Sequence, residues 1–331
     1  MRLRFVVLLV VLAALAAAGA FLMSPTPTLE TQALVVEIAP MAGVIEIAER
    51  LRETNAVRSA WVFVAVSTVR GGVRRLKPGE YEFPKGASTL AVARMVESGR
   101  VRQHPVLHPE GATISELARA LESARLARAE DVLRVARDRA FLTTNGIEGP
   151  SAEGYVFPDT YQFVRGMRVE DMLGRMIQRT RAKLPSDVAD RARARGLTVH
   201  QLLTLASIIE REAAVPEEQP LIAAVFANRL KIDMPLQADP TVQYAVGKER
   251  RTLTRSDLQT DHPFNTYRHT GLPPGPIASP GVRAVEAALD PAPVKYLYFV
   301  AVSADGRRHH FSTTVEEHNA AVTRYRLSRS Q

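Results

Sequence analysis

Two glutamates, Glu210 and Glu212, stand two residues apart in the stretch SIIEREAAV, which begins at Ser207. A carboxyl group that is half-buried at the edge of a core has a raised pKa. If it keeps its proton near neutral pH, it can serve as a general acid. The pair can equally form a solvated rim that pairs with Arg211 and nearby bases. These residues alone leave both interpretations open.

The preceding stretch, TVHQLLTLASIIE, predicts the helix that positions the two glutamates. Thr198 and Gln201 form a capping box, in which each side chain satisfies a free N–H group of the first turn. An apolar stripe at helical spacing should face a core; its members are Leu202, Leu205, Ala206, Ile209 and Ala213. At about 100° per residue, the two glutamates fall on opposite borders of this stripe.

Two long polar stretches, LQADPTVQY and NTYRHTGLPPGPIASPG, follow this helix and are predicted to be mainly loops. Amide, hydroxyl and aromatic side chains together are suited to a carbohydrate, because sugar hydroxyl and N-acetyl groups need donors and acceptors and sugar rings pack on aromatic faces. Gln237, Asn265 and Tyr267 are candidate substrate contacts within these stretches. The alternative is a pair of structural loops whose polar groups satisfy their own backbone.

Other kinds of site have weaker support. His309 and His310 are adjacent on a predicted strand and therefore point to opposite faces, and no HExxH motif occurs, so a metal site is not favoured. Ser207 lacks the GxSxG context of a nucleophile elbow. The chain has no cysteine, which excludes disulfides and thiol catalysis, and its formal charge of +8 is scattered without a nucleic-acid-binding motif. No nucleic-acid partner is expected.

The N-terminus predicts a membrane anchor. Phe5–Met23 is an apolar run of nineteen residues, about 28 Å as a helix, which matches the hydrocarbon core of a bilayer. Arg2 and Arg4 place the N-terminus in the cytoplasm by the positive-inside rule, so the rest of the chain should lie outside. The alternative is a cleaved signal peptide with Ala18-Gly19-Ala20 as its small-residue site.

A repeat follows the anchor. PKGASTLAVARMVES (84–98) aligns without gaps to PEGATISELARALES (109–123), and each copy follows a short strand-like run, GEYEF or HPVLH. Each copy predicts a strand, a turn and a helix capped at Ser88 or Thr113, and ALVVEI near Ala33 predicts the strand of a looser third copy. The repeats indicate a compact α+β module, which could bind a ligand or act as a spacer.

The C-terminal half predicts further regular elements. Helices are expected at about 169–184 and over PLIAAVFANRL, and a last helix is expected from Val315. VKYLYFVAVSADGRRHHFST predicts a β-hairpin with Asp305-Gly306 as its turn.

Several of these motifs occur together in one known family. LASIIEREA, LQADPTVQYAVG, NTYRHTGLPPGPIASPG, YLYFVA, HHFSTT and EEHN follow one another in the order and approximate spacing of the endolytic murein transglycosylase family, also called YceG-like. EGYVFPDTYQF matches the segment ahead of the catalytic helix in that family. The chain thus resembles this family over nearly its whole length after residue 30.

The resemblance implies an α+β fold class and a single-pass inner-membrane protein with an external catalytic domain. The expected organisation is a cytoplasmic tip with a transmembrane helix (1–24), a linker (25–32), a LysM-like strand–turn–helix module (33–125) and a mixed α/β catalytic domain with long groove-forming loops (126–331). The catalytic domain would lie in the periplasm. Its substrate would be nascent peptidoglycan, which it would cut within the glycan strand to terminate elongation, and peptidoglycan synthases are candidate partners.

The resemblance also assigns the site. The essential glutamate of the family maps to Glu212, a choice that helix periodicity did not make. Glu212 would protonate the glycosidic oxygen between N-acetylmuramic acid and N-acetylglucosamine and then accept the proton of the muramyl C6 hydroxyl, giving a 1,6-anhydro end without a metal or organic cofactor. LQADPTVQY and NTYRHTG are then expected to line one groove with Glu212. The candidate substrate-binding residues are Glu210, Gln237, Asp239, Thr241, Tyr244, Asn265 and Tyr267.

Two alternatives of other classes remain open. The chain could be a muramidase that hydrolyses the same bond with Asp239 as the second carboxylate. It could also be a non-catalytic scaffold whose repeats bind the cell wall.

Overall fold

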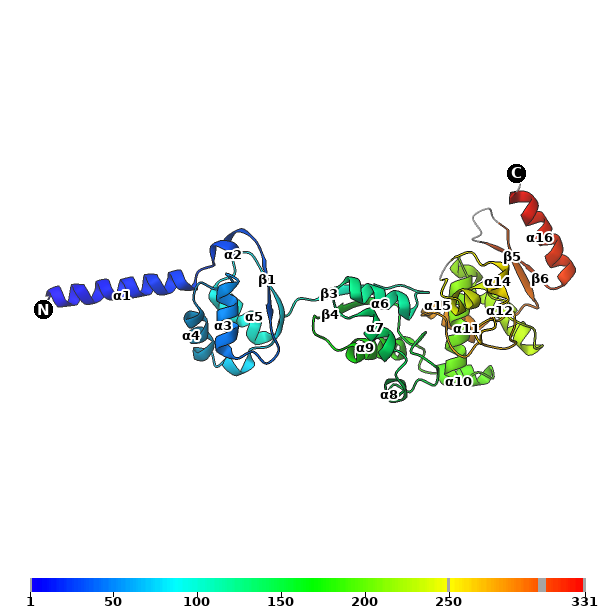
Figure 1. Cartoon of the computed structure of the whole chain (residues 1–331), viewed down its shortest axis with the longest axis horizontal. Coiled ribbons are helices and arrows are strands. Elements are labelled where there is room, and N and C mark those ends of the chain that lie inside the picture. The colour runs from blue at the N-terminus through cyan, green and yellow to red at the C-terminus, as the bar shows by residue number, and fades with distance from the viewer. Residues whose placement is uncertain (1, 249–250, 303–307, 330–331) are drawn as a thin grey trace. The chain divides into compact units, whose positions relative to one another are not determined.

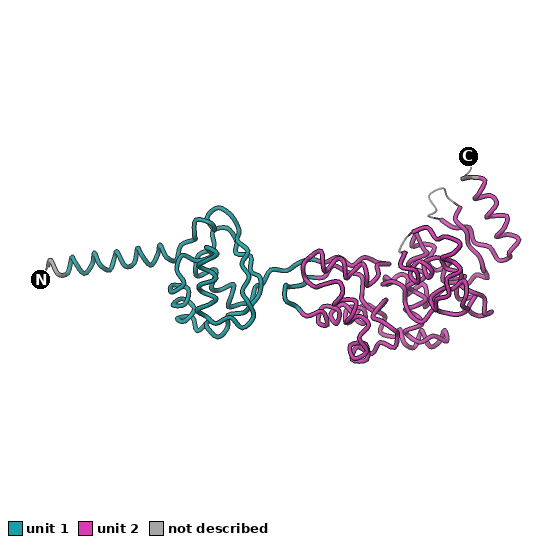
Figure 2. The backbone as a smooth tube through the Cα atoms, viewed as in Figure 1, with its two compact units in different colours: residues 1–105, 162–167 teal, residues 106–161, 168–331 magenta. Residues whose placement is uncertain are grey.

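The computed structural model describes residues 2–248, 251–302 and 308–329. The described residues form a mainly helical α+β fold in which the strands pair two by two, β1 with β2, β3 with β4 and β5 with β6 (Figure 1). The chain divides into two compact units, unit 1 (residues 1–105 and 162–167) and unit 2 (residues 106–161 and 168–331), drawn in teal and magenta in Figure 2. The predicted α+β class agrees with this architecture.

Unit 1 begins with the long apolar helix α1 and continues into a small α+β module. Its elements are α1 (Arg2–Met23), α2 (Pro27–Thr31), β1 (Leu34–Ile38), α3 (Val44–Glu53), α4 (Ala60–Val69), η1 (Val73–Arg75), β2 (Gly79–Phe83) and α5 (Thr89–Ser98). β1 and β2 are antiparallel, with Leu34 opposite Phe83 and Ile38 opposite Gly79. Phe63, Tyr81 and Phe83 are fully buried in the core of the module.

Local signals account for the predicted helix α5. The Ser88 side chain accepts a hydrogen bond from the Ala91 N–H, and Gly99 ends the helix in the left-handed region at φ 69°. The stretch 25–32, expected as a linker, contains α2, and Leu29 of α2 is fully buried in the same core. This stretch is therefore packed onto the module, because burial of Leu29 is favourable and the Leu29 carbonyl accepts a hydrogen bond from the Gly86 N–H.

Unit 2 contains the second copy of the repeat and all the candidate site residues. Its elements are β3 (His104–His108) and β4 (Asp159–Phe163), which both span the division, and α6 (Ile114–Ser123), α7 (Ala129–Val135), α8 (Arg139–Thr144), α9 (Val169–Lys183), α10 (Val188–Ala194), α11 (Val199–Glu212), η2 (Pro216–Glu218), α12 (Gln219–Lys231), α13 (Asp239–Ala245), α14 (Arg255–Leu258), α15 (Val282–Leu289), β5 (Tyr298–Ala301), β6 (His309–Ser312) and α16 (Val315–Arg329). The predicted hairpin is confirmed in its strands, since β5 and β6 pair antiparallel. The predicted turn at Asp305-Gly306 lies outside the described residues.

The second repeat copy lies in unit 2, and the division between units falls at residue 105, where the expected boundary was residue 125. The strand–turn–helix structure of the copy is confirmed, with Thr113 and Glu116 forming a capping box on α6. Its turn is bonded to a distant segment: the Gly111 N–H donates to the Ser279 carbonyl at 2.8 Å, and His108 Nε2 lies 2.8 Å from the Ser279 hydroxyl. These long-range contacts hold the copy in unit 2.

Helix α11 runs through the core of unit 2 and carries the two glutamates at its C-terminal end. The capping box predicted at Thr198 and Gln201 is present. The predicted apolar stripe is buried from Leu202 to Ile209, and α11 packs against α12, α13 and α15. The helix ends at Glu212, because Ala213 adopts an extended conformation.

The long polar stretches are more helical than expected. LQADPTVQY, predicted to be mainly loop, contains α13, which begins at Asp239 with Pro240 in its first turn. Proline at the first positions of a helix lacks only an N–H that would be unsatisfied there. The Asp-Pro pair is thus a helix start, and the sequence-based expectation of a loop was incorrect over residues 239–245.

Candidate active site

A cavity of about 350 Å³ lies where the end of α11 meets the start of α13, within unit 2. Four carboxylates and one guanidinium share this cavity, and they come from three separate segments of the chain. The lining residues are Glu110, Gly111, Glu210, Arg211, Glu212, Asp239, Pro240 and Gln243.

Glu212 is half-buried at the C-terminal end of α11. Burial among protein atoms raises the pKa of its carboxyl group to about 8, and the negative charge of Asp239 acts in the same direction. The positive charges of Arg229 and Arg211 oppose the shift without cancelling it. Glu212 is therefore mainly protonated at neutral pH while it remains in contact with the cavity, which is the state that a general acid requires.

Glu210 lines the same cavity in a different setting. Its Oε2 accepts a hydrogen bond of 2.9 Å from the Gly281 N–H, and this bond favours the charged form. Burial, and to a smaller extent Glu110, still raises the pKa of Glu210. The two glutamates thus differ in what acts on their carboxyl groups. The Glu210 carboxylate accepts a backbone hydrogen bond from Gly281, just before α15, and this bond opposes the rise of its pKa. At Glu212, burial and the charge of Asp239 raise the pKa, and only the two arginines oppose them.

Asp239 and Tyr267 form a pair beside Glu212. The Tyr267 hydroxyl donates a hydrogen bond of 2.6 Å to Asp239 Oδ1. Burial, this bond and the charges of Asp239 and Glu212 raise the pKa of the Tyr267 phenol far above its usual value, so it remains a hydrogen-bond donor. Tyr267 and Asp239 were both predicted at the site, and the structure brings them to Glu212.

Asn265 and Thr241 were expected to contact substrate, and the structure instead buries them completely. Asn265 Nδ2 donates to the carbonyls of Leu258 and Thr260 at 3.0 and 2.7 Å, and its Oδ1 accepts from the Tyr267 N–H at 3.0 Å. The Thr241 hydroxyl donates to the Ala238 carbonyl at 2.7 Å. These two side chains hold the loops that carry Asp239 and Tyr267, because buried backbone carbonyls need donors.

Gln237 and Tyr244 do not line the cavity with Glu212. Gln237 is exposed, with a left-handed backbone at φ 49°, and its N–H donates to the Thr266 carbonyl. Tyr244 faces another cavity, where its ring lies 5.0 Å from that of Phe264. A role for Gln237 in binding substrate stays a prediction, and Tyr244 belongs to a separate part of the surface.

A larger cavity of about 590 Å³ lies elsewhere in unit 2 and is lined in part by Arg195, His200 and Pro274. It contains neither Glu210 nor Glu212. The chemistry belongs to the smaller cavity, because that is where a carboxyl group with a strongly raised pKa meets further titratable groups.

The sequence of unit 2 and much of unit 1 matches a known family profile. The profile of the YceG-like family covers residues 36–324. This chain belongs to the YceG-like family. The predicted resemblance is therefore confirmed.

Similar proteins include named relatives and a solved structure. The endolytic murein transglycosylase of Bacillus subtilis (strain 168) is 32% identical, over 95% of this chain and 90% of the relative. The protein of the same name from Streptococcus pneumoniae serotype 2 is 29% identical, over 88% of this chain and 58% of the relative. The crystal structure of a putative YceG-like protein from Listeria monocytogenes has a TM-score of 0.61 and 32% identity, covering 87% of this chain and 99% of that one.

Two contributors to the site of this YceG-like chain were not predicted from the sequence. Arg229 is buried and donates to the carbonyls of Leu297 and Leu236 at 2.7 and 2.6 Å, so its charge is fixed where it acts on Glu212. A single arginine near the end of a helix gives little local signal of this role. Gly111, in the turn of the second repeat, accepts a hydrogen bond of 3.0 Å from Arg211 Nη1. The repeat pattern indicated a turn there but not its distant partner.

Proposed function

We propose that this chain is a membrane-anchored endolytic murein transglycosylase that cuts the bond between N-acetylmuramic acid and N-acetylglucosamine within peptidoglycan strands. The observation that carries the proposal is the half-buried Glu212, whose carboxyl group has a pKa raised to about 8 in a cavity it shares with Asp239. Family membership and the names of the relatives support peptidoglycan as the substrate.

One residue suffices for the reaction. The protonated Glu212 carboxyl gives its proton to the bridging oxygen, and the C1–O bond breaks so that the N-acetylglucosamine side leaves with a hydroxyl group. The Glu212 carboxylate then accepts the proton of the muramyl C6 hydroxyl, whose oxygen bonds to C1. The product carries a 1,6-anhydro ring, no water is consumed, and Glu212 regains its proton.

The neighbours of Glu212 set its proton affinity. Asp239 raises the pKa of Glu212 and Arg229 lowers it, and both are held by hydrogen bonds to fixed partners. Burial keeps the acid form at neutral pH, and the two charges adjust the balance so that the group can release and regain a proton. The exposed Asp239 and the phenol of Tyr267 are suited to hydrogen bonds with sugar hydroxyls.

Helix α1 is the membrane anchor in this proposal. Phe5–Met23 is the one described helix that is long and apolar enough to cross a membrane. With Arg2 and Arg4 in the cytoplasm, the LysM-like module of unit 1 and the catalytic part of unit 2 lie on the periplasmic side of the inner membrane. A cut at this position would end the elongation of glycan strands made at the same membrane.

A muramidase is the second candidate, because Asp239 supplies another carboxylate next to Glu212. As a base or nucleophile, Asp239 would lead to a reducing muramic acid end. The masses of the muropeptides released from purified sacculi separate the two functions, since the hydrolysed end is heavier by one water. Anhydro ends support the transglycosylase, and reducing ends would support the muramidase.

A further inference from the structure

Helix α4 has an unusual composition for a helix at the surface of a module. Its sequence, AWVFVAVSTV, contains no charged residue. One side, with Ala60, Phe63 and Ser67, is buried in unit 1. A helix that packs one side on a core normally presents charged or strongly polar residues on the other.

The outward face of α4 is apolar instead. Trp61 is 73% exposed and Val69 is 89% exposed, and Ala65 between them is also exposed. These three residues are spaced by four and therefore form one stripe along the helix. An exposed apolar stripe of this length indicates a surface that contacts another apolar phase.

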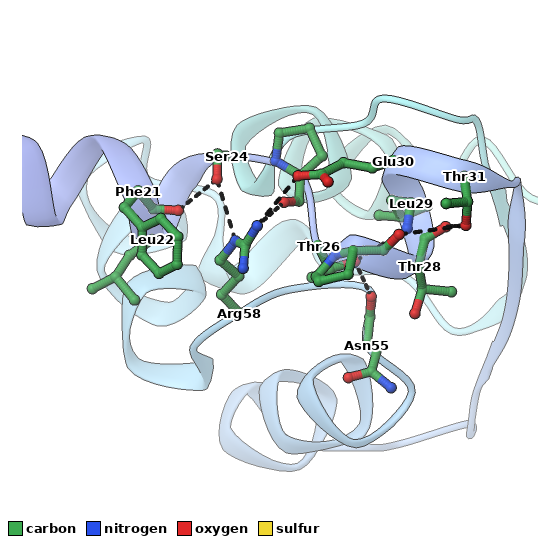
Figure 3. A network of polar contacts seen from close by, with 12 residues as sticks. Phe21, Leu22, Ser24, Thr26, Thr28, Leu29, Glu30, Thr31, Asn55 and Arg58 are labelled. Atoms are coloured by element: carbon green, nitrogen blue, oxygen red, sulfur yellow. Dashed lines mark hydrogen bonds and ion pairs between the residues drawn. The ribbon is translucent and has the colours of Figure 1, made fainter.

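The start of α4 is joined to the end of α1. Arg58, which stands next to the α4 N-cap Ser59, donates from Nε to the Ser24 hydroxyl at 3.2 Å and from Nη2 to the Pro25 carbonyl at 2.6 Å (Figure 3). The Arg58 guanidinium also lies over the Phe21 ring, 4.4 Å from its centroid. Arg58 thus ties the last turn of α1 to the first turn of α4.

Further hydrogen bonds lie at this junction. The Thr26 hydroxyl donates to the Asn55 carbonyl at 2.5 Å (Figure 3), and the Thr89 hydroxyl donates to the Leu22 carbonyl at 3.2 Å. These bonds join the end of the anchor directly to the segment that precedes α4 and to the start of α5.

We propose that the α4 stripe, Trp61, Ala65 and Val69, lies in the outer surface of the same membrane that α1 spans. The proposal rests on the membrane anchoring in the function proposed above. A span that ends at Met23 brings Ser24 and Arg58 to the bilayer surface, and α4 begins immediately after Arg58. Tryptophan is favoured at the membrane–water interface, and an apolar helix face that lies in this interface is stabilised by the area it buries.

The charges that follow α4 fit a lipid surface. Arg74 and Arg75 are exposed just beyond the end of the helix. Basic side chains close to a bilayer are attracted by anionic head groups. Arg70 is paired with Glu97 at 3.1 Å and remains within unit 1. The apolar stripe and the two exposed arginines together form a surface for phospholipid with anionic head groups.

Trp61 is the only tryptophan in the chain, so its fluorescence reports on this face alone. The full chain is reconstituted into vesicles of phosphatidylcholine and phosphatidylglycerol, with or without bromine on the upper part of the acyl chains. Bromine quenches tryptophan only at close range. We expect an emission loss of about twofold or more in the brominated vesicles. Emission equal in the two kinds of vesicle would overturn the proposal.

A matched variant controls for position. Trp61→Phe with Val35→Trp moves the single tryptophan to β1, on the side of unit 1 away from α1 (Figure 1), at a site that is 42% exposed. We expect no bromine quenching in this variant. Equal quenching at both positions would contradict a specific α4 contact.

Two other occupants of the stripe have their own signatures. If bromine does not quench the emission but added glycan strands change it, the stripe contacts sugar. If bromine does not quench the emission but the emission depends on the number of chains per vesicle, the stripe contacts a second copy of the chain. Either result overturns the proposal. Flotation of the chain with the vesicles after a carbonate wash tests α1 separately. A chain that floats but is not quenched contradicts only the α4 contact, whereas a chain that does not float contradicts the anchor and the contact together.

Discussion

The Tyr267 hydroxyl donates a hydrogen bond of 2.6 Å to Asp239 Oδ1, and the charge of that same carboxylate raises the pKa of Glu212. The bond fixes Asp239 at the start of α13, which begins where α11 ends at the cavity. The proton affinity of the proposed acid therefore depends on a residue 27 positions away in the sequence.

Replacing Asp239 by Asn should lower the pKa of Glu212, because the amide removes the negative charge and keeps the oxygen that accepts from Tyr267. The active form of Glu212 is protonated below a pKa of about 8. As the pH rises, the activity of Asp239→Asn should therefore begin to decline at a lower pH than that of the wild type. At pH 8 we expect the variant to be less active by about twofold or more. The pH profile of sacculus cleavage measures this. Asp190→Asn, which removes an exposed charge on α10, is the control. An unshifted profile in Asp239→Asn would exclude the charge effect.

Replacing Glu212 by Gln should make the protein relatively more stable at high pH. The folded-state pKa of Glu212 is about 8 against an ordinary value of 4.5, so the folded wild type binds the proton more tightly and loses stability as pH rises from about 4.5 to 8. The variant lacks this loss. We expect the free energy of unfolding of the variant, relative to that of the wild type, to be higher at pH 9 than at pH 4 by about 1 kcal/mol or more, which corresponds to a few degrees in Tm. Glu217→Gln, at an exposed glutamate, should show no such gain. If Glu212→Gln also shows no gain, the pKa of Glu212 is not raised in the folded protein.

Asn265→Ala should destabilise unit 2. The change leaves the carbonyls of Leu258 and Thr260 without their donor inside a loop, at a cost of about 1–3 kcal/mol. Activity should fall with stability, because the same loop carries Tyr267. Thermal unfolding of the variant checks this, with Gln259→Ala at an exposed position of the same segment as the control. A Tm equal to that of the wild type, with activity lost, would restore Asn265 as a substrate contact.

Helix α11 could be predicted from the sequence because its signals are local. Thr198 and Gln201 cap it, and its apolar stripe repeats with the helical period. The same period could not separate Glu210 from Glu212, since each lies at a border of the stripe. The difference comes from the Gly281 N–H, which reaches Glu210 from a segment 71 residues later in the chain.

The unit boundary and the inner faces of the loops could not be predicted. The two repeat copies have nearly the same local pattern, yet the second one packs in unit 2 because Ser279 pairs with Gly111 and Ala112. Asn265 has the residue type of a sugar contact, but three hydrogen bonds within its own loop hold it in the interior. Partners distant in sequence decide both outcomes.

The most direct test of the proposed mechanism compares the products of the full-length wild type with those of Glu212→Gln on purified sacculi. Mass spectrometry should show 1,6-anhydromuramyl ends from the wild type. The variant should lose activity by about 10⁴-fold, the upper end for general acid–base catalysis, since one residue acts first as acid and then as base. Glu210→Gln should lose less. A folded Glu212→Gln protein that still released anhydro products at a rate near that of the wild type, or wild-type products with reducing muramyl ends, would contradict the proposed role of Glu212.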